Sequence, residues 1–237
     1  METTATREHP ILFRPELVRK ILDGKKTQTR RPVKWKKLPG DEDIRSWHQD
    51  GGGNWIGWSC TEKDDPELAY YTKQMYPTAE GFPCPVGQVG DVLWVRERWR
   101  LGGAFIDTKL SEFYDAAEVL WEHVHYAADD IQEHFEGQWR PSIHMPRWAC
   151  RLRLEITDVR VERVQDISEA DAVAEGMKRI ELTSGIIPDM EPPFNRVHPM
   201  TSTYAEAFKQ AWNAAYPGSW DRGDWVWVIT FKKLESR

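Results

Sequence analysis

The chain has 237 residues, a formal net charge of −6 and three cysteines. A chain of this length can bury a core without disulfides or a structural metal, and the wide spacing of Cys60, Cys84 and Cys150 excludes a disulfide framework and a zinc motif. Proteins that bind duplex nucleic acid through many phosphates normally carry a basic surface, so the acidic balance disfavours that class.

We expect a cytoplasmic protein that does not span a membrane. Nothing near the first residues resembles a signal peptide, and no apolar run approaches about 18 residues. The cysteines are then reduced thiols. The negative charge still allows a small ligand or one splayed nucleotide to bind, because such recognition needs only a few local cations.

The first predicted elements are a short strand, a helix and a second strand. Residues 11–13 are apolar and suit a strand, and Pro15 suits the first position of a helix, where its missing N–H costs nothing. Apolar residues then recur at i, i+4 spacing, and Gly24 takes the position beyond the helix end that favours glycine. Residues 25–31 follow as a loop that runs into a strand.

Two segments have many turn-forming residues and weak periodicity, namely residues 33–89 and 178–200. We interpret both as loop insertions with little regular structure, within a single domain that spans residues 1–237. Irregular stretches of this length in a compact domain are usually functional or mobile.

The rest of the chain predicts further strands and two more helices. Helices are expected from Ser168 to near Gly176 and from Thr203 to Pro217, because each start resembles a capping box. Several strands with two or three helices indicate an α+β domain around a small β-barrel. A helix can also be drawn through residues 111–120. The predicted strands cover residues 92–99, 118–127, 148–164 and 225–233.

Lys26, Thr29 and Arg31 form the candidate site. In a strand that begins near Thr27, residues 27, 29 and 31 point to one face, and Lys26 lies in the preceding turn, where it can reach a nearby hydroxyl. This pairing is similar to that of Ser–Lys hydrolases, in which a neutral lysine activates a hydroxyl nucleophile. The same residues also suit a solvated basic hairpin, and their spacing leaves both interpretations open.

Residues 21–31 resemble the signature of the ASCH domain family, G-x-K-x-x-(E or T)-x-R. Its fixed positions are filled here by Gly24, Lys26, Thr29 and Arg31. Residues 90–97 resemble the second conserved strand of the family, and residues 141–148 and 225–231 are similar to its phage and prophage branch. The resemblance covers most of the chain outside the two insertions, and it implies a β-barrel related to the PUA fold, which handles RNA or modified nucleosides.

One ASCH subgroup consists of amidohydrolases that remove the acyl group of N4-acetylcytidine with a threonine, a lysine and a glutamate. Lys26 and Thr29 match two of these positions, and Glu175 matches the third, in a short helix after the long strand. Glu169 and Glu97 are the alternatives for the acid. The resemblance thus implies an amidohydrolase that acts on an N4-acylated cytosine nucleoside or a related modified base.

The implied mechanism gives each residue a role. Neutral Lys26 takes the proton of Thr29, whose oxygen attacks the acyl carbonyl, and a protonated Glu175 donates to the leaving cytosine nitrogen. The pKa of Lys26 must then fall from about 10.4 to about 7–8, which requires a buried lysine. The expected substrate contacts are Arg31, Gly24 and Glu97, with Arg31 orienting the base.

No metal or cofactor is expected. His123, His125 and His134 lack the spacing of a metal-binding helix motif and suit surface or strand positions. The basic residues among 34–37 either form a solvated patch or guide a phosphate to the site.

The alternative function is that of a noncatalytic PUA-like module that binds single-stranded RNA or a modified nucleotide. Thr29 favours the hydrolase, because threonine supplies a nucleophile. The negative net charge counts against broad RNA binding.

Overall fold

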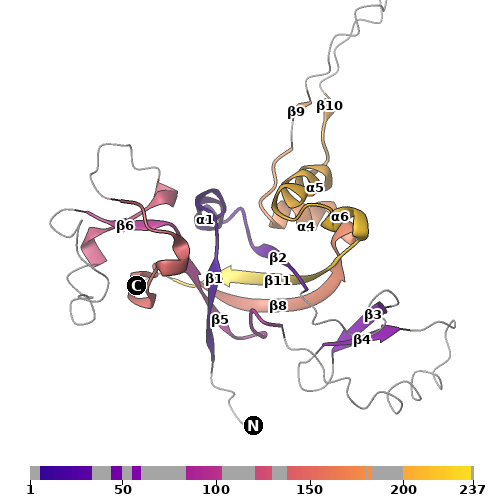
Figure 1. The fold of residues 1–237 in the computed structure, drawn as a ribbon, viewed down its shortest axis with the longest axis horizontal. Helices are drawn as coiled ribbons and strands as arrows, with labels where there is room; N and C mark the ends of the chain where they lie inside the picture. The colour runs from indigo at the N-terminus through magenta and orange to yellow at the C-terminus, as the bar shows by residue number, and fades with distance from the viewer. Residues whose placement is uncertain are drawn as a thin grey trace, which may run out of the picture.

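The computed structural model describes residues 6–33, 44–49, 55–59, 84–102, 121–129, 138–179, 181–182 and 200–235. Within these residues helices pack against a five-stranded mixed sheet (Figure 1). The predicted α+β class is therefore confirmed.

The sheet is built from β1 (Glu8–Leu12), β2 (Gln28–Pro32), β5 (Val92–Arg96), β8 (Arg153–Arg163) and β11 (Trp225–Lys233). The strand order is β1-β5-β8-β11-β2. β1 and β5 are parallel, and the other neighbours are antiparallel. β1 and β2 lie at opposite edges without pairing, so the described residues form an open sheet and not the closed barrel that the sequence predicts.

The described part of the chain contains four α-helices, which are α1 (Pro15–Leu22), α4 (Glu169–Ala174), α5 (Tyr204–Ala215) and α6 (Ser219–Arg222). α1 begins at Pro15 as predicted, and the Thr203 and Glu206 side chains form the complete predicted capping box of α5. At α4, only the Ser168 hydroxyl of the predicted box is engaged, accepting from the Asp171 N–H. Among the described residues no helix is long and apolar enough to cross a membrane.

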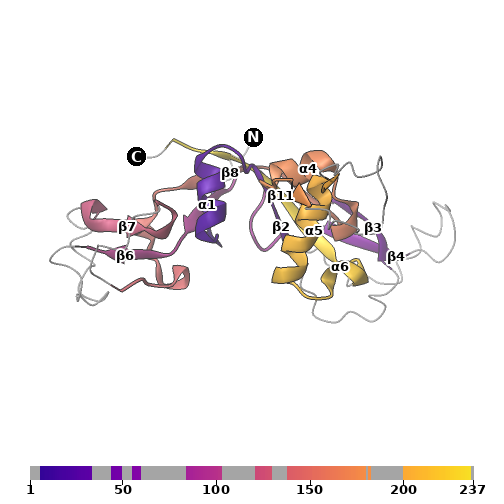
Figure 2. The same ribbon diagram turned by 90° about the horizontal axis from the view of Figure 1, so that it is seen from above.

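β11 organises the core because its successive residues face two different hydrophobic clusters. Trp227 and Ile229 belong to the cluster that includes the buried side of α1, whereas Val226 and Val228 belong to the cluster that includes α5. Figure 2 accordingly shows α1 on one side of β2 and β11, with α4 and α5 on the other. The edge strand β2 is therefore flanked by helices on both of its faces.

The predicted strand over residues 92–99 is divided in two. β5 ends at Arg96, and β6 (Trp99–Leu101) pairs separately with β7 (Val124–Tyr126). The break falls at Glu97, whose backbone N–H donates to Met145 Sδ at 3.1 Å instead of continuing the ladder of β5. Beside these strands the chain forms short 3-10 turns at Trp121–His123, Ala127–Asp129, Ser142–His144, Arg147–Ala149 and Val164–Asp166.

Each predicted insertion holds one antiparallel strand pair among its described residues. These pairs are β3 (Ile44–Gln49) with β4 (Trp55–Ser59), and β9 (Glu181–Leu182) with β10 (Met200–Thr201). These short pairs are the regular structure that is described within the two segments. The basic residues 34–37 and the alternative helix 111–120 lie outside the described residues.

α1 and α4 both end on a glycine next to the candidate site. Gly24 has a φ of +69° and Gly176 a φ of +79°, a left-handed conformation that glycine adopts without steric cost. The Thr27 N–H donates to the Ala174 carbonyl at 2.8 Å, which bonds the segment after α1 to the end of α4. Two helix ends that are far apart in the sequence are thereby joined.

Alanine substitutions at these glycines separate backbone strain from crowding. A Cβ at position 24 meets no atom within 4 Å, whereas one at position 176 lies 2.9 Å from Lys20 Cδ and 3.3 Å from Lys26 Cβ. Gly24→Ala should lower the free energy of unfolding by about 1–2 kcal/mol through left-handed strain. Gly176→Ala should cost about 1–3 kcal/mol more, because Lys20 must move away and Lys26 Cβ is crowded. Urea unfolding measures both costs, and equal values would contradict the close packing.

Candidate functional site

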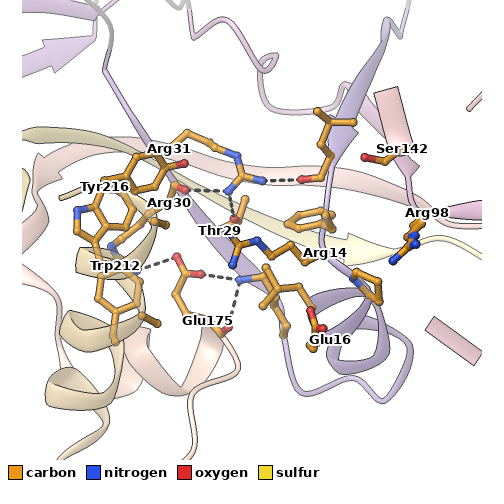
Figure 3. Close-up of a pocket in the computed structure, with 18 of the residues that line it drawn as sticks. Arg14, Glu16, Thr29, Arg30, Arg31, Arg98, Ser142, Glu175, Trp212 and Tyr216 are labelled. Atoms are coloured by element: carbon orange, nitrogen blue, oxygen red, sulfur yellow. Dashed lines mark hydrogen bonds and ion pairs between the residues drawn. The ribbon is translucent and has the colours of Figure 1, made fainter. Parts of the chain in front are cut away.

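A cavity of about 860 Å³ lies beside β2, between the start of α1 and one side of α5 (Figure 3). Residues 12–17 and 29–31 line it, and α5 contributes Trp212 together with the exposed Ala211 and Ala215. This volume falls within the range of small-molecule sites, about 300–1,000 Å³. The candidate residues Lys26, Thr29, Arg31 and Glu175 all line this one cavity.

Lys26 is buried, with 2% of its surface exposed. Its ammonium donates to Glu175 Oε2 at 2.5 Å and to the Glu175 main-chain carbonyl at 3.1 Å, at the C-terminal end of α4. Burial lowers the pKa of Lys26 below its ordinary value, and the attraction of Glu175 opposes this shift. The direction is the one that a lysine base requires.

Glu175 lies between two cations. Its Oε2 faces Lys26, and its Oε1 faces Arg30 NH1 at 3.4 Å. The carboxylate is buried, with 4% of the residue exposed, so both contacts act away from bulk water.

Arg30 connects the site to a network of charges behind β2. Its guanidinium donates to Gln28 Oε1 at 2.7 Å and to Glu162 Oε1 at 2.5 Å, and it lies 3.3 Å from Asp171 Oδ2. Burial alone would raise the pKa of Asp171, but hydrogen bonds from Gln28, Ser168 and Arg160 lower this pKa to about 2. The network ties β2 to β8 and α4, and thereby fixes the cation that faces Glu175.

Thr29 and Arg31 share one face of β2, as predicted. The Thr29 hydroxyl, on a residue that is 1% exposed, accepts a hydrogen bond from Arg31 NH1 at 2.9 Å. Arg31 also donates to the Leu12 carbonyl at 3.0 Å and lies over the Phe13 ring, and burial lowers its pKa. Arg31 therefore contacts the candidate nucleophile, a contact that the sequence prediction did not include.

The expected direct contact between Lys26 and Thr29 is not formed. Both hydrogen bonds of Lys26 Nζ in the described structure go to Glu175, and the Thr29 hydroxyl accepts from Arg31. A hydroxyl has one donor and two acceptor positions, so the Thr29 proton is still available to a base. The two side chains line the same cavity, and a rearrangement of Lys26 would be needed to join them.

The other predicted residues lie away from the cavity. Gly24 ends α1, and Glu97 is fully buried in a paired contact with Arg151, at 2.9 and 3.0 Å. Burial raises the pKa of Glu97, against the attraction of Arg151. Glu169 accepts from two N–H groups at the start of α5, which lowers its pKa. Of the three candidate glutamates, Glu175 alone contacts Lys26.

Several lining residues are not singled out by the sequence. Arg14 and Arg98 line the cavity, and neither belongs to a recognisable motif. Helix α5 does contain a signal, because Phe208 and Trp212 are buried while Ala211 and Ala215, between and beyond them, are exposed and line the cavity. Small residues beside a buried stripe can thus mark a cavity wall.

No metal-binding cluster is found among the described residues: no group of three His, Cys, Asp or Glu side chains lies close enough together. His123 ends the 3-10 turn before β7 and His125 lies within β7, both outside the cavity lining. His134 lies outside the described residues.

Comparisons of the chain with protein-family models, with curated proteins and with solved structures find no match. The ASCH resemblance therefore stays a prediction. The chemistry of the site has to be inferred from the contacts of Lys26, Thr29, Arg31 and Glu175.

A double-mutant cycle tests the Lys26–Glu175 pair. Lys26→Met should lower the free energy of unfolding by about 3–5 kcal/mol, because it leaves a buried carboxylate with one cation fewer. Adding Glu175→Gln should recover part of this loss, with a coupling of about 0.5–3 kcal/mol. Urea unfolding of the single and double variants measures both values.

The neighbouring Lys25–Asp23 pair is the matched control. It has a similar contact of 2.7 Å but is more than half exposed on both sides. Lys25→Met should therefore change stability by no more than about 1 kcal/mol. A Lys26→Met cost as small as that of Lys25→Met would contradict the buried ion pair.

Proposed function

We propose that this protein is an amidohydrolase that removes the acyl group of an N4-acylated cytosine nucleoside or a related modified base. The observation that carries the proposal is that Lys26, Thr29 and Glu175 line one cavity. Lys26 and Glu175 are 149 positions apart and still make a buried contact of 2.5 Å. The ASCH resemblance assigns the same three residues to this reaction.

One proton transfer between Lys26 and Glu175 supplies both the base and the acid of the reaction. Transfer of a proton from the ammonium to the carboxylate yields a neutral amine and a carboxylic acid, with no change in net charge. Burial lowers the pKa of Lys26 and so makes its neutral form easier to reach. The pair then consists of a general base at Lys26 and a general acid at Glu175.

The reaction proceeds in two steps. Lys26 takes the Thr29 proton as Oγ1 attacks the acyl carbonyl, and Glu175 protonates the cytosine nitrogen as its bond to the acyl carbon breaks. Water, deprotonated by the carboxylate of Glu175, then attacks the acyl-Thr29 ester. The Thr29 oxygen leaves with the proton from Lys26, so hydroxyl, amine and acid are all restored. Arg31, which donates to Thr29 Oγ1 at 2.9 Å, stabilises the negative charge that develops on that oxygen.

The cavity walls suit a planar base. Three aromatic side chains line the cavity, namely Phe13 and, from the α5 region, Trp212 and Tyr216. Trp212 and Tyr216 are themselves in contact, with ring centres 4.5 Å apart, which holds both rings in place. A flat heterocycle beside these rings would bring its exocyclic nitrogen towards Glu175.

A second candidate is a noncatalytic module that binds a modified nucleotide. The observation that favours it is that Lys26 makes both of its hydrogen bonds to Glu175 and none to Thr29. In this alternative the pair joins α4 to the segment before β2, and the cavity binds the ligand without turnover.

Substitutions at two threonines separate the candidates. Wild type should release cytidine from N4-acetylcytidine, and Thr29→Val should abolish this because the nucleophile is lost. Thr29→Ser should keep activity, and Lys26→Met should lower kcat/KM by about 10²–10⁴-fold. Thr27→Val is the matched control, because Thr27 is exposed and outside the cavity lining.

Circular dichroism checks that each variant is folded. Turnover that survives Thr29→Val would contradict the nucleophile. A folded wild type that binds cytidine without hydrolysing its acetylated form would favour the binding module.

A further inference from the structure

The cavity is more cationic than the chain that surrounds it. Among the described lining residues five are cationic and two are acidic, whereas the whole chain has a net charge of −6. The cations are Arg14, Lys26, Arg30, Arg31 and Arg98, and the acids are Glu16 and Glu175. A cavity of this kind concentrates positive potential and attracts an anion.

Three of these cations have partners within the site. Lys26 and Arg30 face Glu175, and Arg31 donates to Thr29 and to two backbone carbonyls. Arg14 and Arg98 differ, because both are exposed and neither forms an ion pair with a described residue. Their charge is available to a ligand.

Arg98 lies at the end of the cavity opposite Trp212 and Tyr216. In Figure 3, Arg98 and Ser142 lie on one side of the pocket, and Trp212 and Tyr216 on the other. Arg98 Cζ is 5.6 Å from the centre of the Trp139 ring, a cation–π contact that holds the guanidinium in position. A ligand that spans the cavity therefore meets Trp212 and Tyr216 at one end and Arg98 at the other.

We propose that Arg98 and Ser142 form a phosphate subsite, that Arg14 adds positive charge to the same cavity, and that the substrate is a nucleotide and not a free nucleoside. The inference rests on the proposed function for the position of the base. The hydroxyl of Ser142, which lines the same end, supplies a further donor to a phosphate oxygen. Arginine suits this task because its planar fork donates two parallel hydrogen bonds to a phosphate.

Besides Glu175, Glu16 is the other acidic residue among the described residues that line the cavity. It lies in the first turn of α1, and its carboxylate acts on Lys20 one turn later, which offsets part of its charge. The positive end of the α1 dipole lies at the same place and adds to the attraction of the two arginines. With five cations against two acids among the described lining residues, the cavity still favours an anion.

The net negative charge of the protein limits which phosphate-containing ligands can bind in the cavity. A long duplex would meet repulsion outside the cavity, whereas one phosphate needs only the local cations. The phosphate can be the monoester of a mononucleotide or a diester in a single strand. Both present the same chemistry to Arg98 and Ser142.

Equilibrium binding tests the subsite without requiring turnover. Calorimetry compares cytidine, cytidine 5′-monophosphate and the trinucleotide CpCpC on wild type, Arg14→Gln, Arg98→Gln and the double variant. Wild type should bind at least one phosphorylated ligand about tenfold or more tightly than cytidine. Each substitution should reduce this ratio, the double variant should bring it near one, and added salt should weaken it. The control Arg222→Gln removes an exposed arginine outside the cavity lining and should leave the ratio as in wild type.

Preference for the monophosphate identifies a mononucleotide, and preference for the trinucleotide identifies a strand; either supports the subsite. Equal affinity for all three ligands, no measurable binding, or a preference that survives in the double variant would overturn it. The outcome is independent of hydrolysis. Nucleotide binding through these arginines without turnover would support the subsite and contradict the hydrolase. Turnover without a preference for the phosphorylated ligand would support the hydrolase and contradict the subsite.

Discussion

The buried contact between Lys26 and Glu175 is the interaction on which the rest of the site depends. A lysine and a carboxylate that are almost wholly removed from water must satisfy each other, because either one alone would be very costly. Their pairing requires the end of α1 and the end of α4 to meet, and the hydrogen bond from Thr27 to Ala174 joins the same two ends. The geometry of the cavity follows from this junction.

The contacts that stabilise the Lys26–Glu175 pair also suit its proposed chemical role. Arg30 holds Glu175 from behind, and its own partners lie on β8 and α4, so the carboxylate has little freedom to move. Burial makes the neutral form of Lys26 easier to reach, which is what a base requires. A contact with only the structural role of joining two helices does not require a threonine hydroxyl in the same cavity. Thr29 supplies such a hydroxyl beside this pair.

The fold was predictable where the signal is local. Pro15 and the glycine at position 24 delimit α1, and the Thr203–Glu206 box starts α5, because each pattern acts within one turn of helix. The break after Arg96 was not predictable, since it depends on Met145. Barrel closure was predicted wrongly, because pairing between edge strands is set by contacts across the whole sheet and not by any one segment.

The candidate site was likewise predictable only where its residues lie close together in the sequence. Lys26, Thr29 and Arg31 fall within six residues, and strand alternation correctly placed the last two on one face. The same alternation sends Arg30 to the opposite face, where its role depends on acids that are distant in the sequence. Glu175 was reached through family resemblance, and its contact with Lys26 had no local signal.

The most direct test of the central claim is an NMR titration of the Lys26 ammonium nitrogen, assigned by its loss in Lys26→Met. We predict that Lys26 titrates below the ordinary lysine value of 10.5, because the cost of burial exceeds the attraction of Glu175. Titration at or above 10.5 would mean that the carboxylate keeps the lysine charged. Lys26 would then be a structural cation and could not act as the base.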